Sequence, residues 1–123
     1  MKGRSARTLS AVGLILALAP TVAVAGNCLS HPEPFLLQSD TVQWSMVVGR
    51  GTESIQGLRG RTMVLDSISL LEQPKAGLVI LQGPSFRYSA GNETGSDSFK
   101  LQIIGTSSHM QGKSTIVVDV QVR

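Results

Sequence analysis

Residues 73–99 constrain the fold of this chain more than any other stretch. Short apolar runs alternate there with breaks that contain Gly or Pro, at Gly77, at Gly83 and Pro84, and at Gly91. This order is typical of strands joined by turns, because Gly accepts positive φ angles and Pro cannot donate to a strand ladder. The stretch therefore predicts one edge of a β-sandwich.

The rest of the chain after residue 40 continues this pattern. Apolar and polar residues alternate over 41–48 and most cleanly over 115–123, as in half-buried strands. Residues 62–72 alternate imperfectly, which predicts a bulge or a strand with both faces partly covered, and the polar stretch 105–112 predicts a loop. With no helical period in this part, the sequence predicts an all-β domain over 41–123, an antiparallel β-sandwich of about seven strands.

The apolar positions of these strands predict the core. The aromatic residues fall in register with the aliphatic ones, which is the usual position for the only Trp and the only Tyr of a small domain. The expected core residues are Trp44, Val79, Phe86, Tyr88, Phe99, Val118 and Val120.

The first 25 residues have the three parts of a secretory signal peptide. Basic residues precede an uncharged apolar run, and the small residues Ala23 and Ala25 suit a signal peptidase. The apolar run is shorter than the about 20 residues of a membrane-spanning helix. We therefore predict cleavage after Ala25, a periplasmic or secreted mature chain without a transmembrane anchor, and a connecting segment over 26–40.

The basic character of the chain belongs to this leader. The net charge is +3, with 11 Lys and Arg against 8 Asp and Glu, and three of the basic residues lie in the leader. The mature chain is then neutral, whereas nucleic-acid binding usually needs a basic excess. We expect no nucleic-acid partner.

Cys28 is the only cysteine, so an intrachain disulfide is excluded. A free thiol on a flexible tail, a disulfide between chains and a lipid attachment remain open, although Asn27 is an unusual residue before a lipidated cysteine. Cys28 and His31 have a C-x-x-H spacing, but a structural zinc needs four ligands and only His109 remains. We predict no metal and no cofactor.

Residues 64–123 contain a set of residues in a fixed order, namely Pro74, Gly77, Val79, Phe86, Tyr88, Gly95, Asp97, Phe99 and the valine-rich run 116–122. In this order the stretch resembles bacterial Ig-like and cadherin-like modules of secreted and surface proteins. The resemblance implies an Ig-like sandwich. The chain departs from the pattern at Ala76, where these modules often have His, and at Ala90, where Pro is common. It also lacks the acidic calcium motifs of cadherin-like arrays.

Four residues of this pattern have a predicted structural role in the loops. Gly77 suits a tight turn after Pro74, and Gly95 allows the chain to re-enter a strand. Asp97 can accept hydrogen bonds from backbone amides at that corner, which we favour over a role as a catalytic acid.

The predicted function is that of a non-enzymatic interaction module that binds a protein or envelope component, including a second copy of itself. Apolar residues at outward positions, namely Leu78, Ile80, Ile104 and Val117, form the candidate partner patch if they cluster, and the alternative is that they lie apart or under a loop. A glycan- or small-ligand-binding sandwich is the alternative, and it requires exposed aromatic residues. An enzyme is not expected. The two histidines are the only side chains that ordinarily titrate near neutral pH, but His31 lies in the connecting segment and His109 in a polar loop, and no carboxylate pair has a recognisable catalytic spacing.

Overall fold

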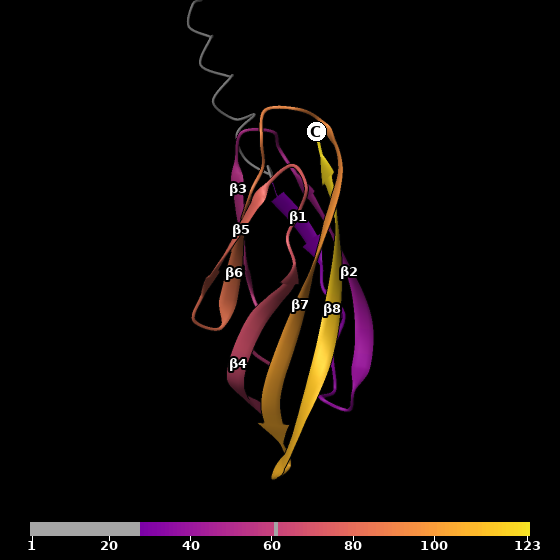
Figure 1. The fold of residues 1–123 in the computed structure, drawn as a ribbon, viewed down its shortest axis with the longest axis vertical. Helices are drawn as coiled ribbons and strands as arrows, with labels where there is room; N and C mark the ends of the chain where they lie inside the picture. The colour runs from indigo at the N-terminus through magenta and orange to yellow at the C-terminus, as the bar shows by residue number, and fades with distance from the viewer. Residues whose placement is uncertain (1–27, 61) are drawn as a thin grey trace, which may run out of the picture.

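The structure is a computed structural model that describes residues 28–60 and 62–123. The predicted signal peptide and its cleavage site therefore lie outside the described residues. The described part is all-β, with eight strands in two sheets that face each other, as in a β-sandwich (Figure 1). None of its residues forms a helix that is long and apolar enough to cross a membrane.

Five strands form sheet A and three shorter strands form sheet B. Sheet A has the order β1 (Cys28–His31), β2 (Asp40–Val48), β8 (Met110–Val122), β7 (Gly95–Ser107) and β4 (Met63–Glu72). Sheet B has the order β3 (Glu53–Gly57), β6 (Ser85–Ser89) and β5 (Leu78–Gln82). The chain thus passes from one sheet to the other several times between consecutive strands.

Sheet A is mixed, so the prediction of an antiparallel sandwich is wrong for one strand pair. β2 and β8 run parallel in unbroken register, from Asp40 opposite Ser114 to Val48 opposite Val122. Alternation shows which face of a strand is buried but not the direction in which it runs. A parallel pair also needs a long connection, and here most of the domain lies between the two strands.

Part of the connecting segment 26–40 belongs to the sandwich. Cys28–His31 is strand β1, which pairs antiparallel with β2 at the edge of sheet A. Phe35 and Leu37 are both only 5% exposed, and they extend the core beyond the strands. Asp40 fixes this passage, because its carboxylate accepts hydrogen bonds from the N–H groups of Leu36 (2.9 Å) and Gln38 (3.1 Å).

The stretch 105–112 is a tight hairpin and not the loop that its polarity predicts. β7 continues to Ser107 and β8 starts at Met110, so only Ser108 and His109 lie between the strands. Both residues have positive φ angles, 52° and 64°. This is the backbone twist of the primed two-residue turns that join long antiparallel strands.

The irregularity predicted for residues 62–72 is confirmed. β4 pairs with β7 but shifts register twice, between Leu65 and Ser67 and between Leu70 and Glu72. Each shift inserts an extra residue and bends the strand, as β-bulges do at sheet edges.

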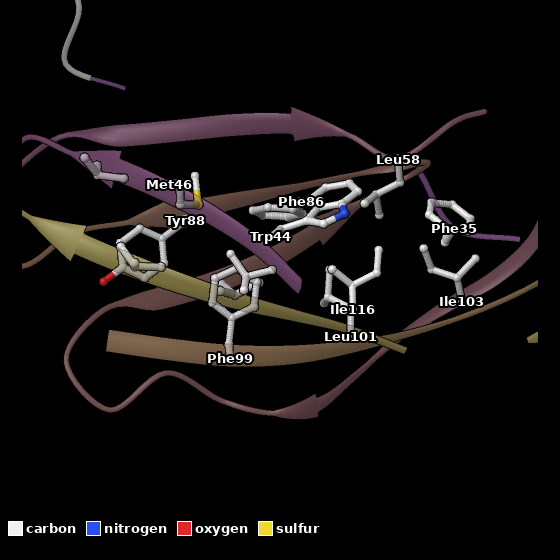
Figure 2. Packing of buried hydrophobic residues seen from close by; sticks show 14 of the residues in the cluster. Phe35, Trp44, Met46, Leu58, Phe86, Tyr88, Phe99, Leu101, Ile103 and Ile116 are labelled. Carbon is white, nitrogen blue, oxygen red and sulfur yellow. The ribbon is translucent and has the colours of Figure 1, made fainter. Parts of the chain in front are cut away.

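The core lies between the two sheets and is built around aromatic residues. Figure 2 shows Trp44, Phe86 and Phe99 near the middle of the cluster, with Leu58 and Phe35 toward one end. Phe99 of sheet A lies edge-on to Phe86 (5.2 Å between ring centroids) and stacks on Tyr88 (5.9 Å), both from sheet B. Such contacts across layers hold the sheets at a fixed spacing.

Candidate functional site

The outer face of sheet B carries an exposed apolar cluster. Leu78 is 52% exposed and Ile80 is 39% exposed, on the face of β5 opposite to the buried Val79. Ile55 of β3 is 65% exposed and projects from the same face, because Ile55 and Ile80 both pair with Arg87 of β6. We call these four residues, Ile55, Leu78, Ile80 and Arg87, the sheet B patch.

Arg87 occupies the centre of the sheet B patch, between its two isoleucines. Its guanidinium lies 3.8 Å from the carboxylate of Glu53, which is on the same face. Its Nε is buried and has no hydrogen-bond partner among the described residues. The long side chain of Arg87 thus lies along apolar neighbours while its charged end stays near the surface, a common arrangement for arginine.

Ile104 and Val117 do not join Leu78 and Ile80, so the four-residue patch is not a single surface. They lie on β7 and β8 of sheet A, whose outer face points away from sheet B. Ile104 stands between Ser67 and Lys113, and Val117 stands between Gln43 and Lys100. Each is therefore an isolated apolar residue among polar ones, which is normal on a protein surface.

Ile55 and Arg87 are the members of the sheet B patch that the sequence analysis missed. The sequence pattern assigns no role to either residue. Their proximity follows only from the pairing of β3 with β6 and of β6 with β5. Alternation within one strand carries no information about which strands are neighbours.

Asp97 is a buried hydrogen-bond centre that joins three segments. Its carboxylate accepts the N–H groups of Lys75 (2.8 Å), Ala76 (3.2 Å) and Gly77 (2.9 Å), all in the connection between β4 and β5. It also accepts the N–H of Ser98 (3.0 Å) and the hydroxyl of Tyr88 (2.8 Å). With both oxygens occupied by backbone and tyrosine donors, this carboxylate is a structural acceptor.

The environment of this pair shifts both pKa values. Burial alone would raise the pKa of Asp97, but hydrogen bonds from Gly77, Tyr88, Lys75 and Ser98 outweigh it and hold the pKa below its ordinary value. Burial, followed by the hydrogen bond and charge of Asp97, raises the pKa of Tyr88. Asp97 is thus kept ionised and Tyr88 neutral, which suits a fixed acceptor and a fixed donor.

The other three loop residues of the expected set lie around this centre. Pro74 is buried just before the amides that Asp97 binds. Gly77 is needed for close packing, because a Cβ there would lie 2.5 Å from the Tyr88 ring and 2.7 Å from the carbonyl oxygen of Ser89. Gly95, where β7 begins, has a φ of 143°, which side-chain-bearing residues rarely adopt.

All five aromatic residues of the chain are buried. Trp44, Phe35, Phe86, Tyr88 and Phe99 are each at most 5% exposed. Trp44 also donates its indole N–H to the carbonyl oxygen of Glu33 (2.7 Å). The exposed aromatic platform that a glycan-binding sandwich requires is therefore not present in the described structure. Val118 and Val120, the remaining predicted core residues, are 1% and 3% exposed, and Val79 is 5% exposed.

The residues with metal or nucleophilic potential are dispersed. Cys28 is half-buried in β1 and its thiol contacts the hydroxyl of Ser54, so it does not lie on a flexible tail as one interpretation of the sequence held. Burial raises the pKa of this thiol, which lowers its reactivity. Within residues 28–60 and 62–123, no three His, Cys, Asp or Glu side chains come close enough together to hold a metal ion.

Comparisons with known proteins give few matches. No family model matches the chain, and no curated protein matches it significantly. Among solved structures, a sialyltransferase from Photobacterium damsela has a similar arrangement with a TM-score of 0.41 and 14% sequence identity. That match covers 66% of this chain and 18% of the sialyltransferase chain.

This likeness corrects one prediction. We predicted from the sequence that the chain is not an enzyme, whereas the similar structure belongs to an enzyme. We therefore do not retain that exclusion. A TM-score of 0.41 over 18% of the other chain assigns no activity, substrate or catalytic residue to this chain.

Proposed function

We propose that this chain is an exported interaction module of the Ig-like kind that binds a protein or an envelope component through the sheet B patch. The observation that carries the proposal is the grouping of three exposed aliphatic side chains, Ile55, Leu78 and Ile80, on one face. Apolar groups gathered on a soluble surface with a polar rim are typical of binding sites.

The charges of the sheet B patch support a protein partner. Arg87 and Glu53 place one positive and one negative group beside the aliphatic residues. Arginine is enriched at interfaces, where it combines apolar contact along its stem with directional hydrogen bonds at its end.

A double variant tests the role of the sheet B patch. Leu78→Thr with Ile80→Thr should keep the fold, because both side chains are exposed and Thr suits strands. The change removes apolar area from the proposed interface, so retention of partners from an envelope extract, or self-association in sedimentation, should weaken. Ile104→Thr with Val117→Thr is the matched control, since it makes the same change on sheet A.

The result depends on the comparison between the two double variants. Loss of association only in the sheet B variant, with melting temperatures unchanged, supports the proposal. Equal association of both variants and the parent protein would show that another surface binds.

Export is tested separately. The sequence of residues 1–25 supports cleavage after Ala25. Intact-mass measurement of protein from the native envelope should give a chain that begins at Gly26. A mass that corresponds to a start at Cys28 with added acyl groups would replace this proposal by a lipoprotein.

A further inference from the structure

The two long sides of the sandwich are closed differently. On the side where β1 meets β3, side chains join the sheets: the Cys28 thiol contacts the Ser54 hydroxyl, and Ser30 donates to Oε1 of Gln56 (2.6 Å). On the opposite side, the structure shows no hydrogen bond between the described strands β4 and β5, and a cleft of about 650 Å³ opens there. That volume is within the usual range of ligand-binding pockets.

The floor of this cleft is the uncovered margin of the core. Met63, Leu65 and Ile68 of β4 and Leu81 of β5 line it, and all four are only partly buried. Ile103, the neighbour of Ile68 on β7, is fully buried. Sheet B has three strands against five in sheet A, so it leaves the inner face of β4 partly exposed.

β5 presents a regular, free strand edge toward this cleft. It pairs with β6 in five consecutive positions without a shift, and no strand lies on its other side in the described structure. Every second residue of an edge strand directs its N–H and C=O groups away from the sheet, where they can pair with another strand. β4 is less suited to pairing, because its two bulges interrupt the edge.

The cleft contains one positive and one negative side chain in its lining, Arg59 and Asp66. Arg59 lines it, is exposed, and forms no ion pair with any described residue. Asp66 also lines the cleft, but its carboxylate accepts hydrogen bonds from Thr106 (3.1 Å) and Gln111 (3.4 Å) of sheet A. A carboxylate on a ligand would therefore complement Arg59.

We propose that this cleft binds an extended peptide segment of a partner protein, which pairs with β5 as a fourth strand of sheet B. The segment would match the five residues of β5, with apolar side chains at alternate positions over Ile68 and Leu81 and a carboxylate near Arg59. An extended peptide fits because it meets the backbone groups of β5 and the apolar floor together. This site is separate from the sheet B patch and does not depend on it.

The test uses a displayed library of linear peptides of about nine residues as the probe, long enough to pair with the five residues of β5 and extend beyond both ends. Selection on the purified mature protein should enrich peptides with alternating apolar residues and an Asp or Glu. The affinity of an enriched peptide, made synthetically, should fall about tenfold or more in Ile68→Thr and in Arg59→Glu, a change of about 1.4 kcal/mol. Ile55→Thr, the same substitution in the sheet B patch, is the matched control and should bind as the parent protein does.

Amide hydrogen exchange gives a second, direct readout. The bound peptide should slow exchange in β5, since its free backbone groups become paired. Arg59 is a surface residue, so its variant carries the test if Ile68→Thr does not fold. The proposal is overturned if no such peptide is enriched, if the cleft variants bind unchanged, or if exchange in β5 stays the same. It is also overturned if the cleft instead pairs two copies, seen as a dimer that Arg59→Glu dissociates.

Discussion

The hydroxyl of Tyr88 donates to the carboxylate of Asp97 at 2.8 Å, and this contact joins sheet B to sheet A within the core. The same carboxylate binds three consecutive amides of the connection between β4 and β5. One side chain thus fixes the spacing of the sheets and the path of the chain that enters β5.

Replacing Asp97 should cost more stability than replacing its tyrosine partner. In Asp97→Asn the side-chain NH₂ group replaces an oxygen that accepts two or three hydrogen bonds. Each donor that loses its acceptor should cost about 1–3 kcal/mol of stability. Tyr88→Phe removes one donor and leaves four, so its cost should be about 1 kcal/mol. Urea unfolding of both variants measures this difference. Equal losses would show that the backbone amides contribute little.

The fold should lose stability in acid. Asp97 and Asp40 both have a pKa held below the ordinary aspartate value by hydrogen bonds that outweigh burial. A carboxyl group with a lowered folded-state pKa stabilises the fold above its unfolded-state value, and this contribution is lost as the pH falls through the folded-state value. The free energy of unfolding should therefore decrease as the pH drops below about 4.

The acid effect can be assigned with one variant. Because Asn does not titrate, Asp97→Asn should show a shallower decline between about pH 5 and pH 2, roughly the range in which aspartates protonate. An identical decline in the variant and the parent protein would assign the effect to other carboxylates.

Gly77→Ala should be strongly destabilising although Ala is a mild substitution. The new Cβ would lie 2.5 Å from the Tyr88 ring and 2.7 Å from the backbone oxygen of Ser89, and the backbone cannot yield easily. Gly57→Ala is the matched control, since a Cβ there meets nothing within 4 Å. Thermal melts should separate the two variants clearly, and a Gly77→Ala protein that melts with the control would contradict the packing around Tyr88.

Trp44→Ala should reduce the free energy of unfolding by about 3–5 kcal/mol, because it empties a large core position. Trp44→Phe keeps most of the volume but loses the hydrogen bond to the carbonyl of Glu33, and it should cost less. Calorimetry of the three proteins tests this order. A Trp44→Ala protein as stable as the parent would place the indole at the surface and revive a ligand-binding role.

The sequence contains the positions of most strands and the direction in which their side chains point, but not their neighbours. Alternation indicates an inward Val79 and an outward Leu78 without reference to any other strand. Whether Leu78 lies beside Ile55 or beside Ile104 depends on which sheet each strand enters, a long-range choice made by packing. For this reason two of the four predicted patch residues, Ile104 and Val117, lie on the other sheet.

Turn geometry explains a second difference. The stretch 105–112 is polar, and polarity alone favours a loop. Ser108 and His109 adopt left-handed backbone angles that let two strands continue almost to the tip. Neither residue is the Asn or Gly that usually marks such a turn, so the local composition carries no signal for it.

The parallel pairing of β2 with β8 has a mechanical consequence. Asp40 lies at one end of the pair and Val122 at the other, with the nine residue pairs of the register between them. A pulling force applied at these two residues acts along the strands, so the hydrogen bonds resist together instead of opening one after another. If tension reaches the module at these two residues while it holds a partner, this strand pair would resist it.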